Sequence, residues 1–173
     1  MKDKSEILEF GIKRDNEERR DGGCGVVFNP KTQKYAVGKN ISDGKFRLFA
    51  GGVDPDEDIE KGVLREVIEE SGLHDFLYVE KITEVMAHYY NHSRNVNRVT
   101  KSTCFLVVLN SDKLVDVQHE EHEKFDLHWA TAEEILSNWK ENNINNDYDH
   151  LFHFFSKAIP RAKELGYDTT SVI

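Results

Sequence analysis

The stretch that decides the fold is Gly51-Gly52-Val53-Asp54-Pro55-Asp56-Glu57, followed after seven residues by Arg65-Glu66-Val67-Ile68-Glu69-Glu70-Ser71-Gly72-Leu73. Apolar residues recur at helical spacing from Ile59 onward, which predicts an amphipathic helix. Acidic residues at its start favour the positive end of the helix dipole, and Gly72 stands where a left-handed residue commonly ends a helix. The stretch therefore predicts a loop followed by a helix with one core face and one charged face.

Three carboxylates share the charged face of this helix. Glu66 comes three residues before Glu69 and four before Glu70, so all three project from one surface. Like charges at this spacing repel one another, and a divalent cation removes the conflict, because hard cations such as magnesium prefer carboxylate oxygens. The alternative, an acidic surface helix, explains neither the glycines nor the lone Arg65. The pattern therefore predicts a cation site.

These residues resemble the Nudix box, written G-x5-E-x7-R-E-U-x-E-E-x-G-U with U aliphatic. The chain matches it at Gly51, Glu57, Arg65, Glu66, Val67, Glu69, Glu70, Gly72 and Leu73. The resemblance covers the box closely and the whole domain loosely. It implies an α/β fold, the Nudix-type α/β/α sandwich with a mixed β-sheet. It also implies magnesium-dependent hydrolysis of a pyrophosphate linkage in a nucleoside diphosphate linked to another group, with manganese as a candidate substitute cation.

The resemblance also implies a set of metal ligands. The side chains it points to are those of Glu66, Glu69 and Glu70. Glu57 would contribute directly or through water. A backbone carbonyl, that of Ala50 or Gly51, would join them, although the glycines can equally serve only a tight turn.

The resemblance assigns two further catalytic roles. Arg65 would orient a box glutamate through a charge-assisted hydrogen bond; the alternative is a surface ion pair with Glu69, four residues further along the helix. The catalytic base would be either Glu66 or a glutamate of the later acidic loop. In that loop Glu121 is the first candidate, with Glu120 or Glu123 as alternatives.

Length and composition describe a soluble domain. The chain has 173 residues, the size of one domain, with 38% hydrophobic and 32% charged residues. We therefore expect a single domain over 1–173 with a loose tail from about 167. No apolar run approaches the roughly 20 residues of a membrane helix, and the N-terminus lacks a hydrophobic signal segment, so the sequence predicts a cytoplasmic protein.

A net charge of -9 argues against broad binding to a nucleic-acid backbone, which needs a basic face. It leaves room for a small anionic nucleotide held through metal, because the cation inverts the local field. The charge does not indicate an oligomeric state.

Two cysteines and two histidines are further candidates for a disulfide or a metal site. Cys24 and Cys104 form no C-x-x-C pair and lie in apolar sequence, which favours buried free thiols over a disulfide or a metal site. His119 and His122 stand among acidic residues, but no cysteine or third histidine completes a familiar zinc spacing. We therefore expect neither a disulfide nor a zinc centre.

The rest of the chain alternates between strand and helix patterns. Expected strands run from Leu8 to Lys13, Cys24 to Phe28, Tyr35 to Lys39, Phe46 to Ala50, Phe76 to Asn91, Val99 to Leu109, and Phe125 to Ala130. A capping box at Thr131 predicts one later helix, and Tyr148 to Leu165 predicts the last, with a kink at Pro160. The charged run from Arg14 to Asp21 is expected to be a solvated loop.

The hairpin predicted after the box carries the candidate substrate-binding residues. Tyr89 and Tyr90 lie 16 and 17 positions after Leu73, where diadenosine polyphosphate hydrolases tend to carry a tyrosine. Either ring could stack on a base or pack in the core. Arg94 and Arg98 give the hairpin tip a basic character suited to phosphate, although a solvated loop is the favoured interpretation.

The sequence leaves the substrate open. A dinucleoside polyphosphate is one candidate, and ADP-ribose, a nucleotide sugar and a nucleoside triphosphate are alternatives. A Nudix fold can also bind a nucleotide without catalysis, but the intact glutamates argue against that function. RNA 5′-end processing would need a basic channel, for which the chain offers little.

Overall fold

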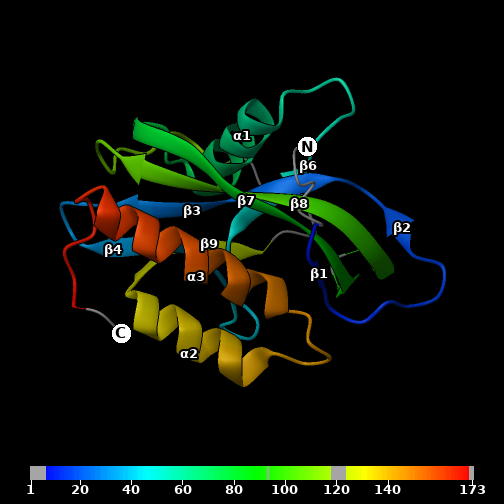
Figure 1. The fold of residues 1–173 in the computed structure, drawn as a ribbon. Helices are drawn as coiled ribbons and strands as arrows, with labels where there is room; N and C mark the ends of the chain where they lie inside the picture. Colours follow the sequence, from blue (N-terminus) through cyan, green and yellow to red (C-terminus); the bar gives the residue numbers. More distant parts are fainter. Residues whose placement is uncertain (1–6, 93, 118–123, 172–173) are drawn as a thin grey trace, which may run out of the picture.

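The computed structural model describes residues 7–92, 94–117 and 124–171. Within these ranges a nine-stranded mixed sheet lies between α1 on one face and α2 and α3 on the other (Figure 1). The strands are β1 (Glu9–Phe10), β2 (Glu18–Arg19), β3 (Gly22–Asn29), β4 (Lys34–Asn40), β5 (Phe46–Arg47), β6 (Phe49–Gly52), β7 (Phe76–Asn91), β8 (Val96–Leu109) and β9 (Phe125–Ala130). The helices are α1 (Ile59–Ser71), α2 (Ala132–Asn142) and α3 (Asp149–Glu164). This arrangement confirms the predicted α/β/α sandwich.

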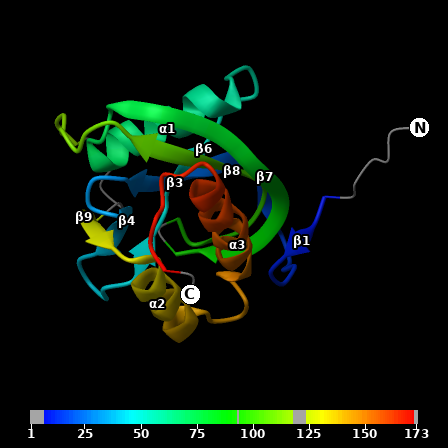
Figure 2. The ribbon, with the colours of Figure 1, turned by 60° about the vertical axis from the view of Figure 1, so that its left-hand side comes forward.

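The sheet is built around β3 and the long hairpin of β7 and β8. Its main path runs β1-β7-β8-β3-β4-β5, while β2 pairs with β8, β6 with β3, and β9 with β4. β3 is parallel to β8 and antiparallel to β4 and β6, so the sheet is mixed. Figure 2 shows β7 and β8 curving past α3.

The apolar residues form one core on each side of the sheet. On what we call the α1 face, Val63 and Val67 of α1 pack with alternate strand residues such as Val27 and Val107. On the α3 face, the other set of strand residues packs with α2 and α3. That second set includes Val26, Phe28, Leu106, Trp139, Phe154 and Phe155. Because side chains alternate along a strand, β3 and β8 contribute to both cores.

Glycines in β3 bring α1 close to the sheet. A methyl group added to Gly23 would lie 2.6 Å from Val63 Cγ2, and one added to Gly25 would lie 2.9 Å from Val67 Cγ2. Both valines are completely buried. The helix therefore rests directly on the backbone of β3.

Both ends of α1 are capped as the sequence predicts. The Asp58 side chain accepts a hydrogen bond of 3.1 Å from the backbone N–H of Lys61. Gly72 ends the helix with a φ of 82°, a conformation that other residues rarely adopt, and its N–H donates to the Ile68 carbonyl. α2 is capped in the same way by Thr131, which accepts from the N–H of Glu134 at 3.1 Å.

The charged run before β3 corrects one prediction. Instead of a solvated loop, it contains β2 and two contacts with distant parts of the chain. Arg14 forms an ion pair of 2.8 Å with Asp147, and Glu17 forms a hydrogen bond of 2.8 Å with buried His88. These contacts fasten the run to β7 through His88 and to the connection before α3 through Asp147.

Several strand boundaries also differ from expectation. The first predicted strand is reduced to β1, because Gly11 turns the chain with a φ of 84°. The strand expected from Phe46 to Ala50 is divided into β5 and β6. β8 begins at Val96 rather than Val99, whereas β7 has the predicted bounds.

The cysteines are free and buried, as predicted. Cys24 of β3 lies beside Cys104 of β8 in the parallel register. Burial raises the pKa of the Cys104 thiol, and the neighbouring Cys24 raises it further. Among the helices of the described ranges, none is long and apolar enough to cross a membrane.

Asp168 anchors the segment that the sequence predicts to be a loose tail. Asp168 is 4% exposed and accepts a hydrogen bond of 2.8 Å from the Tyr35 hydroxyl. The Thr170 N–H donates to the same carboxylate at 2.9 Å, and Lys163 lies 3.4 Å from it. A buried carboxylate with several donors anchors the chain end to the core.

We expect Asp168→Asn to lower the free energy of unfolding by about 1–3 kcal/mol, because an amide leaves some of these donors poorly paired. Burial disfavours the charged form of Asp168, but hydrogen bonds from Thr170 and Tyr35 and the charge of Lys163 hold its pKa below the usual value. The carboxylate's stabilisation is therefore present above about pH 4 and is lost as the pH falls through the lowered pKa. Urea denaturation at pH 7 and pH 3 measures both effects; an equal loss at the two pH values would contradict this assignment.

Candidate functional site

The box spans the end of β6, the loop that follows it, and α1. Glu66, Glu69 and Glu70 lie on α1, as the sequence predicts. β6 ends in Gly51 and Gly52, and the loop after it returns the chain to Ile59 at the start of α1. A methyl group on Gly51 would lie 2.3 Å from Glu66 Cδ and 2.5 Å from Glu66 Oε1. The Glu66 carboxylate therefore rests directly on the Gly51 backbone, and a larger residue at position 51 would displace it.

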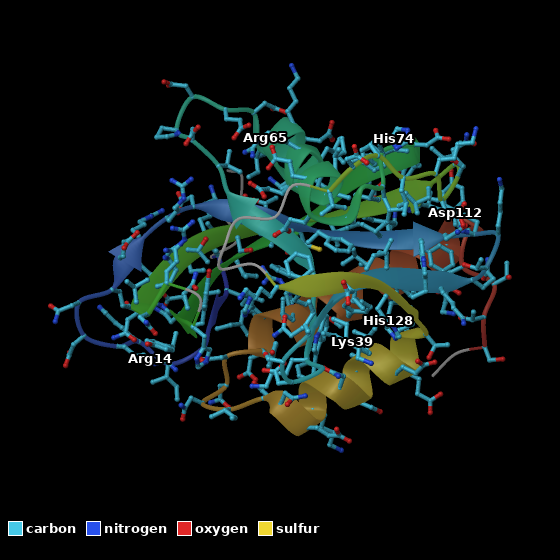
Figure 3. All side chains as sticks on the ribbon, turned by 180° about the vertical axis from the view of Figure 1, so that it is seen from behind. Arg14, Lys39, Arg65, His74, Asp112 and His128 are labelled. Carbon is cyan, nitrogen blue, oxygen red and sulfur yellow. The ribbon has the colours of Figure 1, made fainter. Side chains whose placement is uncertain are left out.

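Arg65 joins the acidic residues of the box (Figure 3). Its Nε and Nη2 each donate a hydrogen bond of 3.0 Å to Glu57, in a two-pronged contact. Its Nη1 donates to Glu66 Oε1 at 2.9 Å and to Glu69 Oε2 at 3.4 Å. The hydrogen bonds from Arg65 lower the pKa of Glu57, despite partial burial. Both contacts that the sequence suggested for Arg65 are thus present, and the contact with Glu66 is the shorter.

Glu70 is fixed separately from the other glutamates. It is only 3% exposed, and its Oε1 accepts a hydrogen bond of 2.7 Å from the Ala50 N–H. Arg47 lies 3.7 Å from its other oxygen, and the Arg47 guanidinium stands 4.4 Å from the centre of the Phe125 ring. A buried carboxylate needs such partners to remain charged, so Glu70 is held at the end of β6.

The carboxylates are gathered but do not surround one point. Over 7–92, 94–117 and 124–171, no three acidic, histidine or cysteine side chains form a group arranged to hold a metal ion. Glu57, Glu66 and Glu69 are drawn together by Arg65, whereas Glu70 is bonded to β6. The Gly51 carbonyl oxygen lies against Gly22, where an added methyl would meet it at 2.2 Å.

The donor set nevertheless fits a hard cation. Its side-chain donors are all carboxylate oxygens, the type that magnesium prefers. The bare backbone of Gly51 leaves room for Glu66 where any side chain would intrude. Magnesium is thus chemically suited to the site, and the ligand assignment stays a prediction. The candidate bases of the later loop, Glu121 with Glu120 and Glu123, lie outside the described residues, as do His119 and His122.

The hairpin residues are separated rather than gathered at one tip. Tyr89 stacks on His150 of α3, with ring centroids 5.9 Å apart. The Tyr90 hydroxyl donates a hydrogen bond of 2.9 Å to Asn95, and its ring meets His92 edge-on. Arg94 is exposed near the turn, whereas Arg98 is buried within β8. The expected basic tip is therefore wrong for Arg98.

Burial determines the electrostatics around Tyr89. It raises the pKa of the Tyr89 hydroxyl, an effect that the charges of Arg98 and Arg47 oppose. It also lowers the pKa of His150 to about 4, so that this ring is neutral at physiological pH. The Tyr89–His150 pair is thus an uncharged, stacked aromatic pair on the α3 face.

Two arginines near the box were not singled out from the sequence. Arg47 pairs with Glu70, and Arg20 lies over Gly52, where an added methyl would come within 2.0 Å of its Nε. Arg20 belongs to the charged run expected to be solvated. The one feature of the sequence that could have pointed to Arg20 is its position two residues before Gly22.

We expect Arg65→Lys to lower kcat by about 10- to 100-fold, the usual cost of losing a residue that supports a metal ligand. Lysine keeps the charge but cannot make the two-pronged contact with Glu57 while also reaching Glu66. Steady-state kinetics with magnesium measures the effect, and Lys61→Arg, on the exposed side of α1, is the matched control. An unchanged kcat would mean that charge alone suffices.

Comparisons with known proteins bear on the family of this chain. The NUDIX domain family matches residues 18–153. The chain is 28% identical over 159 residues to Nudix hydrolase 6 of Arabidopsis thaliana, a match that covers 88% of this chain and 52% of that protein. The chain thus spans about half the length of that relative. It is also 26% identical over 134 residues to an RNA pyrophosphohydrolase of Wolbachia pipientis, covering 70% of this chain and 82% of that protein.

Solved structures share the fold at low identity. The NUDIX domain of Shewanella oneidensis NrtR, complexed with ADP ribose, aligns with a TM-score of 0.57 and 19% identity over 86% of this chain and 89% of that one. A NUDIX hydrolase from Nitrosomonas europaea aligns with a TM-score of 0.52 and 20% identity over 80% and 90%. Both curated relatives carry the names of hydrolases. Because the match from residue 18 to residue 153 takes in the box and the whole β7–β8 hairpin, the chain belongs to the NUDIX domain family.

Proposed function

We propose that this protein hydrolyses a pyrophosphate linkage in a nucleoside diphosphate linked to another group, with magnesium as the cation. The observation that carries the proposal is the arrangement of the box: Glu66 rests on Gly51 and is held by Arg65, while buried Glu70 is bonded to Ala50. Charged groups held in advance of substrate binding need little reorganisation during the reaction. The box is therefore built for catalysis on a highly charged substrate.

Glu66, Glu69 and Glu70 would hold the cation, with the Gly51 carbonyl as a further ligand. When bound, the cation would neutralise phosphate charge and lower the pKa of the attacking water. Both oxygens of Glu57 accept hydrogen bonds from Arg65, which favours a contribution through Arg65 or through water over direct ligation. Arg65 would in turn keep Glu66 oriented toward the β6–α1 junction.

The base that accepts the proton of the attacking water would be Glu66 or Glu121. Glu66 is already positioned by Arg65 at 2.9 Å, and a carboxylate so held is suited to accept a proton from a nearby water. Glu121, outside the described residues, precedes β9 by four positions of sequence, and β9 begins at Phe125 and pairs with β4. A pH–rate profile of each Glu→Gln variant would separate the two, because loss of the base removes the acidic limb of the profile.

For the substrate, we propose a small nucleotide, with a dinucleoside polyphosphate first. The aromatic pair of Tyr89 and His150 offers an uncharged surface near Arg98, as a base followed by phosphates would need. ADP-ribose is the ligand of the Shewanella NUDIX domain, and RNA is the substrate named for the Wolbachia relative, so both belong in the test. A cytoplasmic location remains part of the proposal.

The test is a substrate panel with magnesium, read by product mass. It comprises dinucleoside polyphosphates, ADP-ribose, nucleotide sugars, nucleoside triphosphates and a 5′-triphosphorylated RNA. We expect release of a nucleoside monophosphate or of inorganic phosphate or pyrophosphate, abolished by a chelator and restored by added magnesium. If no compound is hydrolysed but one binds, the protein is a nucleotide-binding module instead.

A further inference from the structure

Arg98 is a buried cation with incomplete pairing. It lies in β8 and is only 7% exposed. Its Nη2 is 3.5 Å from Glu18 Oε1, and among the described residues its Nε–H has no hydrogen-bond partner. A guanidinium binds carboxylate or phosphate best through two parallel hydrogen bonds, and Glu18 provides one long contact. The side chain of Glu18 is 57% exposed, so solvent competes for this pair.

Two hydroxyl residues follow Arg98 along β8, in the direction of the position that pairs with Gly22. Thr100 and Ser102 follow Arg98 at every second position of β8, so all three side chains project from the same face of the sheet. Cys104 and Leu106 continue this row into the core beneath α2 and α3, which identifies it as the α3 face. Thr100 is 6% exposed and Ser102 is 9% exposed. Buried positions next to an apolar core are thus filled with hydrogen-bonding groups.

At its Ser102 end, the row of Arg98, Thr100 and Ser102 lies next to two glycines, Gly22 of β3 and Gly52 of β6. Ser102 is paired with Gly22 of β3, which is paired with Gly52 of β6, so the two positions between Ser102 and the end of β6 carry no side chain of their own. Arg20 covers Gly52 and is fixed by a backbone hydrogen bond of 3.1 Å to Val99. Arg20 and Arg98 therefore border the same row at different distances from Gly51.

An aromatic surface adjoins the far end of the row. Tyr89 is the cross-strand partner of Arg98, so the two side chains leave the sheet on the same face. The Tyr89 ring lies against His150 of α3, where β7 and β8 curve past the helix (Figure 2). Arg98 thus stands between a stacked aromatic pair and two buried hydroxyl residues on the α3 face.

We propose that Arg98, with Thr100 and Ser102, binds a phosphate group of the substrate on the α3 face, and that Glu18 occupies the guanidinium until that phosphate displaces it. A phosphate offers several oxygens to a planar fork and can pair Nε–H and Nη2 together, which Glu18 does not. The inference rests on the proposed function and narrows it. Arg98 is four residues along β8 from Ser102, about 13 Å at the usual rise per residue. Ser102 is itself joined to Gly52 only through Gly22, so Arg98 lies farther still from the end of β6, and the site takes a phosphate remote from the cleaved bond, as in a dinucleoside polyphosphate.

The test uses ADP as the probe and isothermal titration calorimetry with a chelator present, so that no metal contributes. We expect Arg98→Gln to weaken ADP binding by about 10-fold or more, the usual size of a lost charge-assisted contact. We expect Glu18→Gln to tighten ADP binding, because the competing carboxylate is gone. Arg19→Gln is the matched control: Arg19 follows Glu18 on β2, faces the opposite side, and pairs with Asp21 at 3.1 Å. It removes the same charge and should leave binding unchanged.

Several outcomes would overturn the proposal. Equal weakening in Arg98→Gln and Arg19→Gln would mean that net charge, not a site, governs binding. Weaker binding in Glu18→Gln would mean that Glu18 supports Arg98 rather than competing with the ligand. Because Glu18 is largely exposed, this variant tests the proposal even if Arg98→Gln fails to fold.

Hydrolysis measured separately distinguishes this inference from the proposed function. If Arg98→Gln turns over a dinucleoside polyphosphate with an unchanged KM, the phosphate site is wrong and the proposed function stands. If the wild-type protein hydrolyses nothing but Arg98→Gln loses ADP binding, the site stands and the proposed function fails. A raised KM with kcat nearly unchanged supports both.

Discussion

Glu70→Gln and Glu66→Gln should each lower the magnesium-dependent turnover of the protein by about 100-fold or more. Loss of a ligand should exceed the roughly 10- to 100-fold cost of losing a residue that only supports one. Glutamine has the same shape and keeps an oxygen to accept from Ala50 or Arg65, so the packing survives. What disappears is the negative charge that a divalent cation requires. Turnover of the best substrate of the panel measures the effect.

The matched control is Glu60→Gln, in the first turn of the same helix but exposed to solvent. It removes one charge from α1 without touching β6, and we expect activity close to that of the wild-type protein. Thermal unfolding should show that all three variants remain folded, because glutamine matches the volume of glutamate and keeps an oxygen to accept from the Ala50 N–H or from Arg65. Near-normal turnover in both Glu66→Gln and Glu70→Gln would remove the box from the mechanism.

Gly51→Val should abolish turnover through shape alone. The first added carbon already falls 2.3 Å from Glu66 Cδ, so Glu66 must leave its place and its contact with Arg65. Overpacking of this kind typically costs about 1–3 kcal/mol of stability. We therefore expect loss of activity together with a measurable fall in the midpoint of urea denaturation, recorded on the same sample.

A change at a glycine away from the box controls for the loss of glycine itself. Gly44, in the turn between β4 and β5, has a φ of 73°, which asparagine tolerates, and a methyl group there would meet nothing closer than Lys39 at 3.7 Å. Gly44→Asn should leave turnover unchanged. If Gly51→Val remains active, the contact between Glu66 and Gly51 has no part in catalysis.

Local patterns predicted the elements whose structure depends on local interactions. α1 was predictable because its periodicity, its acidic start and Gly72 all indicate the same helix. β7 has the predicted bounds because nothing in its sequence favours a turn between Phe76 and Asn91. The proximity of Glu66, Glu69 and Glu70 followed from helical geometry in the same way.

Contacts between distant residues were not predictable from the sequence alone. Glu17 bonds to His88, and Tyr35 to Asp168, across 71 and 133 positions of sequence. Polar residues with such partners have the composition of a loop or a tail. The sequence places Arg98 at the hairpin tip because its neighbours are polar. The burial of Arg98 in the structure depends instead on the curvature of β7 and β8 past α3, which the sequence does not show. The pairing of Glu70 with Arg47 likewise requires the turn that brings β5 beside α1.

The contact between α1 and the glycines of β3 means that apolar residues set the position of the box carboxylates. Val63 and Val67 touch the backbone of β3 at Gly23 and Gly25, and the strand sets how near the helix can come. Glu66 and Glu70 belong to the same rigid turns of α1, and both meet β6, which is itself paired with Gly23. A single methyl group added on the floor beneath α1 would lift the carboxylates away from β6. The acidic site therefore depends for its alignment on residues that carry no charge and never touch the substrate.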